Sequence, residues 1–140
     1  MDFRVLLPIL LCVSGCATSP LPPVDANKAW IDFATPAPGG KVLMAERLDG
    51  RRVADGRFFQ VAPGSHELEV RFDFEVYSGG GLGMQAEPQE RLCYLIVRYD
   101  HFEAGQRYRL EARSLAFSPS ARLYNAKREI VAEDRQANCL

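Results

Sequence analysis

Alternation of hydrophobic and polar residues is the strongest pattern in the middle of the chain. From Glu67 to Val76 every second residue is apolar, and the residues between them are charged. This period of two predicts a β-strand with one face in a core and one in water, because successive side chains point to opposite faces. A helix would spread the same residues around its whole circumference. The segment 107–113 alternates in the same way and predicts a second strand of this kind.

The segment between these two strands, Leu92–Val97, is apolar at every position. Such a run is typical of a central strand that is buried on both faces. Cys93, Leu95 and Val97 would share one face, and the other three residues would share the opposite one. The polar segment 99–103 that follows is predicted to connect this strand to the next.

Turn signals separate the predicted strands. Asp49-Gly50 and Asp55-Gly56 are typical of tight turns, because glycine accepts a positive φ. Pro63-Gly64 fits the centre of a type II turn. Further reversals are expected at Gly105 and in the glycine run after Ser78.

The segment 122–132 has two interpretations. In a β-hairpin, Leu123 and Tyr124 pair with Ile130 and Val131 across a turn. In a helix, several of the same apolar residues would share one face. We favour the hairpin, because the rest of the chain reads as strand.

Short strands with frequent turns and no strong helical period predict an all-β fold. We expect a small antiparallel β-sandwich of the immunoglobulin or transthyretin type, with about seven strands. The first apolar cluster, Lys28–Phe33, lies before the confident strands, and we expect Trp30 to cover one end of the core. If the strands at 67–76 and 107–113 are neighbours, their outward charges would form cross-strand pairs.

Composition limits the class of protein. The chain has 140 residues, with 17 Lys and Arg against 18 Asp and Glu, and a net charge of −1. This balance argues against a nucleic-acid partner, since such binding needs a basic face. A charged fraction of 25% and an aromatic fraction of 10% argue against a wholly disordered chain. The length suits one domain.

The N-terminal residues have the features of a secretory signal peptide. A short n-region with Arg4 is followed by an apolar stretch up to Val13, and then by small residues before Cys16. The sequence Val13-Ser14-Gly15-Cys16 resembles the lipobox of bacterial lipoproteins. The resemblance implies that the Cys16 thiol carries diacylglycerol and that residues 1–15 are removed as a signal peptide.

The same resemblance predicts where the protein is located. Several acyl chains together anchor a protein durably to a membrane. Ala17 is not the Asp that holds many such lipoproteins at the inner membrane, so the resemblance implies the periplasmic face of the outer membrane. Residues 16–27 are rich in Pro, Ser and Thr and predict an extended tether, which leaves 28–140 as the β-sandwich domain.

Cysteine pairing follows from this location. Cys12 would leave with the signal peptide and Cys16 would carry lipid, so Cys93 and Cys139 remain. Two thiols in an oxidising compartment tend to pair, which predicts a disulfide between a central strand and the C-terminus. The alternative is two separately buried thiols.

The stretch Leu48–Val70 resembles the PEGA-type repeat of bacterial surface proteins. It contains an Asp-Gly turn, a predicted strand, a Pro-Gly turn, a small residue and His66, and then the alternating strand. Ala62-Pro-Gly-Ser65 stands at the tetrapeptide that gives the repeat its name. The resemblance implies a small β-sandwich without catalytic residues.

The two histidines favour structural roles. His66 lies beside the Pro63-Gly64 turn, and we expect it to hydrogen-bond that turn. Asp100, His101 and Glu103 offer metal-ligand atoms, but adjacent residues on a strand point to opposite faces. The chain has no HExxH motif and no pair of CxxC motifs, so we predict no metal, no cofactor and no enzymatic activity.

The glycine run is the best sequence candidate for ligand binding, since mobile loops at the ends of a sandwich often carry binding sites. It lacks the Gly-Lys-Ser/Thr ending of a phosphate-binding loop. An aromatic face beside it would contact a sugar ring. The possible ligand-binding residues are Tyr77, Gly79, Gly80, Gly81 and Gly83.

Two functions remain open at this point. The first is a membrane-anchored, non-enzymatic module of the bacterial envelope that interacts with an envelope protein or polymer. The alternative is a module that binds a small ligand or a glycan with the loop at 78–84. Buried Tyr77 and Trp30 side chains would remove the contact residues of the second.

Overall fold

The computed structural model describes residues 15–16, 18–77 and 87–140, and these residues contain nine strands and no helix. The all-β prediction is confirmed, although about seven strands were expected. The short strands are missing from the sequence pattern because two or three residues show no alternation. The strands are β1 (Ala29–Ala34), β2 (Gly40–Leu48), β3 (Arg51–Arg52), β4 (Phe59–Val61), β5 (Gly64–Tyr77), β6 (Pro88–Phe102), β7 (Arg107–Leu115), β8 (Ser118–Tyr124) and β9 (Ile130–Cys139).

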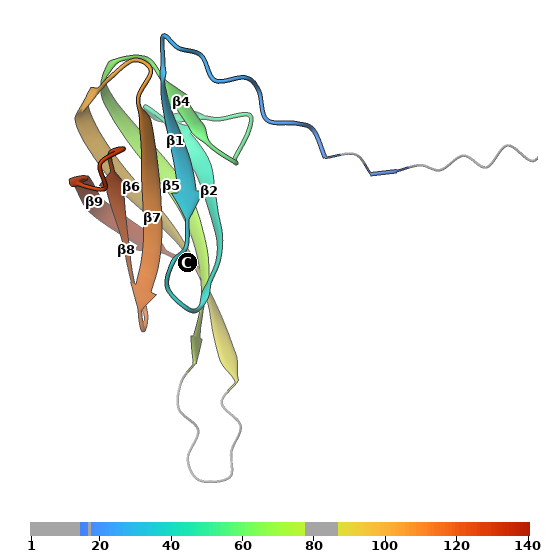
Figure 1. The fold of residues 1–140 in the computed structure, drawn as a ribbon. Helices are drawn as coiled ribbons and strands as arrows, with labels where there is room; N and C mark the ends of the chain where they lie inside the picture. The colour runs from blue at the N-terminus through green and yellow to red at the C-terminus, as the bar shows by residue number, and fades with distance from the viewer. Residues whose placement is uncertain (1–14, 17, 78–86) are drawn as a thin grey trace, which may run out of the picture.

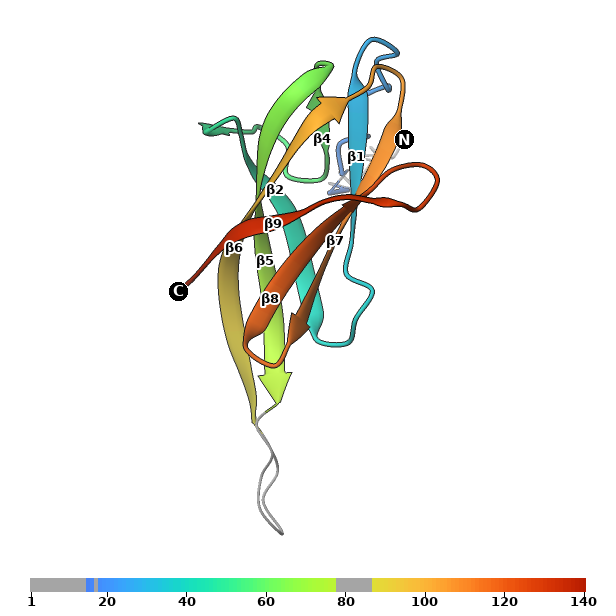
Figure 2. The same ribbon diagram turned by 90° about the vertical axis from the view of Figure 1, so that its left-hand side faces the viewer.

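The strands form one hydrogen-bonded sheet in the order β3-β2-β5-β6-β9-β8-β7-β1-β4, which folds over into two layers (Figure 1). We call the layer of β4, β1, β7 and β8 sheet I, and the layer of β3, β2, β5 and β6 sheet II. Strand β9 belongs to both, because its first part pairs with β8 and its later part with β6 (Figure 2). The molecule is therefore a sandwich joined along one side by β9.

One strand pair departs from the predicted antiparallel arrangement. Strands β1 and β7 are parallel, with Trp30 beside Arg107 and Phe33 beside Leu110. The chain crosses from sheet I to sheet II directly after Ala34, so the neighbours of β1 are later strands that return from the other layer. Local sequence gives no sign of the direction in which such a strand returns.

The core lies between the two sheets. Every predicted inward residue of β5 is buried, which confirms the alternation from Glu67 to Val76. Residues of β6 add to this layer, and apolar side chains of β1, β4, β7 and β8 pack against it from sheet I. The nine strands and the core residues that the structure describes all lie between Ala29 and Cys139. The largest fully buried core side chains include Phe59, Phe72, Phe74, Ile31, Leu68, Leu95, Leu110 and Leu123.

Trp30 does not cover an end of this core, contrary to the sequence prediction. It is 2% exposed, but it lies on the outer face of sheet I, where its Nε1 donates to Asp32 at 2.8 Å. Its ring stacks on Phe58 with centroids 4.2 Å apart, and the Arg107 guanidinium lies over it. Strand parity explains the error, because Ala29 and Ile31 take the inward positions of β1.

Two other predictions about neighbours are wrong. Strands β5 and β7 belong to different sheets, so their outward charges do not pair across strands. The segment 99–103 is no connection, because β6 continues through Phe102, which is buried. Asp100 is polar in sequence, yet it lies in the strand beside β5, where it accepts a hydrogen bond from Ser65.

The C-terminal hairpin is confirmed over the helical alternative. Strands β8 and β9 pair antiparallel, with Tyr124 opposite Ile130. The turn between them is closed by a hydrogen bond from the Arg128 amide to the Asn125 carbonyl. The Asn125 side chain also accepts from the Lys127 amide, which fixes the turn.

The two Asp-Gly turns differ in their need for glycine. Asp49 and Gly50 both have positive φ, as expected for a tight hairpin turn. Gly56 has no positive φ, contrary to the prediction. A Cβ atom there would lie 2.7 Å from the Met44 Cε atom, but this is the flexible end of a side chain that is 41% exposed, so Met44 can move aside.

A disulfide joins Cys93 of β6 to Cys139 of β9, as predicted. The two residues are opposite each other in the strand register, with Cα atoms 4.0 Å apart. The bond therefore fixes the last part of β9 to sheet II, across 46 residues of sequence.

Candidate functional site

The outer face of β6 is apolar, although its neighbours carry charges there. Cys93, Leu95 and Val97 are buried in the core, as the sequence predicts. The predicted burial of the opposite face is not observed, because Leu92, Tyr94 and Ile96 are only half-buried. Among the strands that the structure describes, none packs on sheet II from this side (Figure 1). We call the row of Leu92, Tyr94 and Ile96 the apolar strip.

Further exposed apolar residues lie on the same face of sheet II, on β2 beyond the charged row of β5 and directly after the end of β9. Val42 and Met44 of β2 are 39% and 41% exposed, and Leu140 after β9 is 80% exposed. The strand register places Met44, Arg71 and Tyr94 in one row across the sheet. Leu140 is held beside the strip, because its amide donates to the Leu92 carbonyl at 2.9 Å.

Ion pairs flank the strip without covering it. The Arg71 guanidinium donates two hydrogen bonds to the Asp73 carboxylate of the same strand, at 3.1 and 3.0 Å. Lys41 Nζ lies 2.5 Å from Glu75 and 2.6 Å from Glu90. The hydrogen bond to Glu75, followed by the one to Glu90, raises the pKa of Lys41 above its usual range. These charged groups satisfy each other, and the apolar atoms between them stay open.

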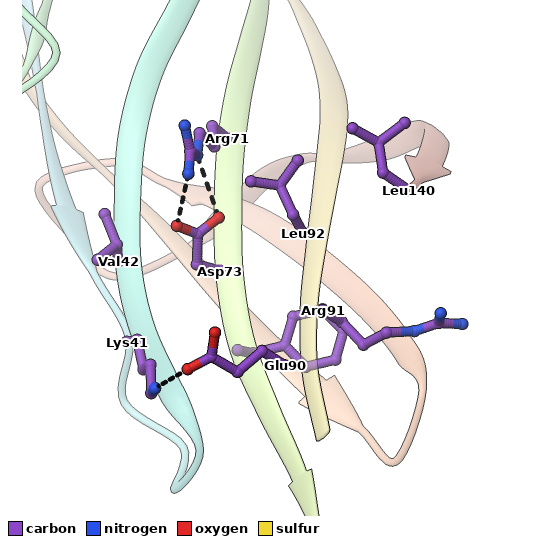
Figure 3. Close-up of a pocket in the computed structure, with 9 residues that line it drawn as sticks. Lys41, Val42, Arg71, Asp73, Glu90, Arg91, Leu92 and Leu140 are labelled. Carbon is purple, nitrogen blue, oxygen red and sulfur yellow. Dashed lines mark hydrogen bonds and ion pairs between the residues drawn. The ribbon is translucent and has the colours of Figure 1, made fainter. Parts of the chain in front are cut away.

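A hollow of about 410 Å³ lies at one end of the strip (Figure 3). Val42, Leu92 and Leu140 contribute apolar surface, and the pair Arg71–Asp73 lies between β2 and β6. We call this hollow the sheet II pocket. An apolar centre with a charged rim is the usual composition of a protein-binding surface. The pocket is lined by Lys41, Val42, Arg71, Asp73, Phe74, Glu90, Arg91, Leu92 and Leu140.

The His66 side chain stabilises a turn, and its ring nitrogens are not free to bind a ligand. Its Nδ1 lies 2.6 Å from Asp49 Oδ2, and its Nε2 lies 2.7 Å from the Ala62 carbonyl. Both ring nitrogens are thus occupied, which confirms the predicted hydrogen bond to the turn. Burial opposes ionisation of Asp49, but hydrogen bonds from the Glu67 amide and His66 outweigh it and lower the Asp49 pKa.

The second histidine, His101, does not form a metal site with the neighbouring acidic residues. Asp100 is hydrogen-bonded to Ser65 and to Arg98, and these hydrogen bonds lower its pKa. His101 follows on the opposite side of β6 and packs edge-on against Tyr99. Within residues 15–16, 18–77 and 87–140 we find no group of three or more His, Cys, Asp or Glu side chains arranged to hold a metal ion.

The predicted loop site is described only at its border. Tyr77 ends β5 and is 64% exposed, and its hydroxyl donates to Glu75 at 3.2 Å. The predicted residues Gly79, Gly80, Gly81 and Gly83 lie outside the described residues. Trp30 is buried and cannot contact a ligand ring.

The N-terminal region is described from Gly15, apart from Ala17. Cys16 is exposed and forms no disulfide. Residues 18–25 form no regular structure and are exposed, and Figure 1 shows them leaving the sandwich at the start of β1. Val13 and Ser14 of the predicted lipobox lie outside the described part.

The sequence did not predict an open apolar strip, because a strand that is apolar on both faces is usually covered by a layer on each side. A usable signal was present in β5, whose outward residues Glu69, Arg71 and Asp73 are all charged. A layer packed on this sheet would have to bury them as well. The contribution of Leu140 depends on β9 pairing with β6, which no local pattern shows.

Comparisons with known proteins did not identify a relative of this chain. The chain matches no protein-family model, and neither curated proteins nor solved structures provide a match. Across the described residues, no helix has the length and hydrophobicity required to span a bilayer.

Proposed function

We propose that this protein is a lipid-anchored, non-enzymatic binding module of the bacterial envelope, held at the periplasmic face of the outer membrane. Its resemblance to lipoproteins at Val13–Cys16 supports the anchor, together with the exposed, unpaired Cys16 thiol. The exposed segment 18–25, whose Ser19 carbonyl accepts a hydrogen bond from Arg57 at 2.6 Å, would connect the domain to the anchor.

The single observation that carries the binding function is the open apolar strip on sheet II. A monomeric sheet face in water is normally polar, whereas Leu92, Tyr94 and Ile96 leave apolar area exposed on a central strand. The partner that suits it is an envelope protein with apolar side chains at its contact, since the strip offers few free hydrogen-bonding groups. The flanking pairs Lys41–Glu90 and Arg71–Asp73 would form the polar rim of this contact.

Anchoring is tested by labelling cells that express the full chain with radioactive palmitate. We expect label on the wild-type protein and none on Cys16→Ser, with the wild type in the membrane fraction. Unlabelled wild-type protein in the cytosol would refute the anchor.

Docking is tested by placing a photo-crosslinking residue at Val42 in intact cells. We expect one adduct of defined mass that disappears when Leu140→Glu is added, because the new charge lies beside Leu92. The matched control is Leu115→Glu, at a position that is 84% exposed but lies on the β7–β8 hairpin. An adduct that survives Leu140→Glu, or is lost equally with Leu115→Glu, would contradict docking on the strip.

Binding of a glycan is the second candidate, and the exposed Tyr77 ring favours it. The Glu75 carboxylate holds the Tyr77 hydroxyl, so one face of the ring has a fixed orientation. If this function is correct, Tyr77→Ala abolishes binding to cell-wall oligosaccharides while Tyr77→Phe retains most of it. Equal binding by wild type and Tyr77→Ala would exclude it.

A further inference from the structure

Sheet I presents an arginine-rich surface on its outer side. Five arginines of β7, β8 and the β8–β9 turn form ion pairs there with three carboxylates. These eight groups together carry two more positive than negative charges, although the whole chain has a net charge of −1. We call it the arginine face. The arginines are Arg107, Arg109, Arg113, Arg122 and Arg128, and the carboxylates are Asp32, Glu111 and Glu133.

Three of these arginines converge on one carboxylate. Glu111 is 4% exposed, and Arg128, Arg109 and Arg113 lie 2.8, 3.3 and 3.7 Å from its oxygens. One carboxylate cannot neutralise three guanidinium groups. The arginine side chains are 60%, 51% and 42% exposed, so N–H donors not used by Glu111 point to solvent.

Neighbouring contacts hold these cations in position. The Arg128 guanidinium lies 4.7 Å from the ring centre of Tyr124, a cation–π arrangement. The strand register places Arg122 beside Glu111 across β7 and β8. Guanidinium groups held on a rigid sheet bind phosphate oxygens with paired hydrogen bonds, at a lower entropic cost than flexible lysines.

The tether enters the fold beside this surface. Strand β1 begins at Ala29 and lies next to β7, with Trp30 beside Arg107. The Gly105 amide donates to the Lys28 carbonyl at 2.9 Å, which fixes the end of the tether at the start of β7. A fully extended chain from Cys16 to Lys28 spans about 40 Å, whereas β7 is about 30 Å long. An anchor at Cys16 thus lets the arginine face lie flat on the bilayer.

We propose that the arginine face binds the phosphate groups of anionic phospholipids at the membrane surface. The choice of a lipid source rests on the proposed anchoring at Cys16, because the anchor keeps this face within reach of headgroups. One lipid anchor combined with a cationic patch binds a membrane more firmly than either alone. With sheet I on the membrane, sheet II faces away, and its apolar strip is open to a partner.

The test uses residues 18–140, which lack Cys16 and contain all nine strands that the structure describes. Cosedimentation is measured with vesicles of phosphatidylethanolamine mixed with anionic phosphatidylglycerol, and with vesicles of phosphatidylcholine alone. We expect binding to the anionic vesicles only, weakening with added salt. Equal binding to both, or to neither, would overturn the proposal.

Matched double variants locate the binding face. Arg113→Gln with Arg122→Gln changes side chains that are 42% and 43% exposed, and it leaves the two closest partners of Glu111 in place. Each change should weaken binding to anionic vesicles about fivefold. The control pair on sheet II, Arg47→Gln with Arg98→Gln, removes the same charge from positions that are 46% and 47% exposed.

We expect the control pair to bind as the wild type does, and thermal unfolding confirms that both pairs fold. An equal loss in both pairs would show an effect of net charge alone and reject a dedicated face. Displacement from vesicles by inorganic phosphate at constant ionic strength would assign the site to a soluble anion. Because this domain carries no anchor, the result is independent of palmitate labelling at Cys16.

Discussion

The outer faces of the two sheets show how similar strands produce different surfaces. In β5 and β7 alike, every second residue is outward and most outward residues are charged. On sheet I the arginines extend over buried groups such as Trp30 and Glu111. On sheet II Arg71 turns along its own strand to Asp73 and leaves the neighbouring apolar strip open. The reach and partners of charged side chains, more than their number, decide which face stays apolar.

The two sheets also hold β9 in different ways. Removing one of these attachments gives the largest change in stability that we predict. Sheet II holds it by the disulfide Cys93–Cys139, and sheet I by contacts such as the hydrogen bond from the Ala121 amide to Asp134. Closing a loop of 46 residues stabilises the fold by about 4 kcal/mol in the chain-entropy model. Cys139→Ala should lower the free energy of unfolding by about that amount, measured with urea.

The control is Asp134→Asn, which weakens the attachment to sheet I and should cost about 1 kcal/mol. Equal losses in the two variants would show that both sheets hold β9 equally well.

The aromatic residues of the two outer faces provide the next comparison. Trp30 is covered by Phe58 and Arg107, whereas Tyr94 is half-buried in the open strip. Trp30→Ala should therefore cost about 3 kcal/mol of stability, and Tyr94→Ala about 1 kcal/mol. Chemical denaturation of both variants measures the difference. Similar losses would mean that the strip is covered as fully as the ring of Trp30.

Trp30 also shows where sequence patterns fail. Alternation predicted the inward faces of β5 and β7 correctly, because each strand contains enough residues to reveal a period of two. In β1 the apolar residues are adjacent, so parity does not separate the core residue Ile31 from outward Trp30. The disulfide was predictable because Cys93 and Cys139 are the two cysteines left when Cys12 and Cys16 are assigned to the predicted signal peptide and lipid anchor. The parallel pairing of β1 with β7 was not, because it depends on residues far apart in the chain.

The candidate site was harder to predict from the sequence than the fold. Leu92, Tyr94 and Ile96 were identified as one face of a strand, but whether a layer covers them depends on the whole topology. The cluster around Glu111 joins β7 to Arg128, which lies 17 residues further along the chain. Sequence alternation indicates only that these groups face outward, and it does not show that they converge.

Glutamates on the two faces test this convergence. Glu111 is 4% exposed among three arginines, while Glu69 is 24% exposed and lies 3.9 Å from Arg47 alone. Glu111→Gln should lower the free energy of unfolding by about 2 kcal/mol, because the guanidinium groups would then repel one another. Glu69→Gln should stay within about 0.5 kcal/mol of the wild type. A neutral Glu111→Gln would show that solvent alone screens the cluster.

The smallest predicted effect is a pH dependence that belongs to sheet I. Burial opposes ionisation of Asp32, but hydrogen bonds from Arg107 and Trp30 outweigh it and lower the pKa of Asp32 below 3.8. A carboxyl group with a lowered folded-state pKa stabilises the fold above its unfolded pKa, and this stabilisation is lost as pH falls through the folded value.

Arg107→Gln should therefore raise the pKa of Asp32 toward 3.8, as followed by NMR titration of the carboxyl carbon. The matched change Arg47→Gln on sheet II should leave the Asp32 titration unchanged. Because the Asp32 side chain is 42% exposed, solvent screens the interaction, and the associated loss of stability stays below about 1 kcal/mol. An unchanged Asp32 pKa in Arg107→Gln would mean that the Trp30 hydrogen bond alone holds the carboxylate. The outer face of sheet I would then depend on its buried aromatic ring and not on its arginines.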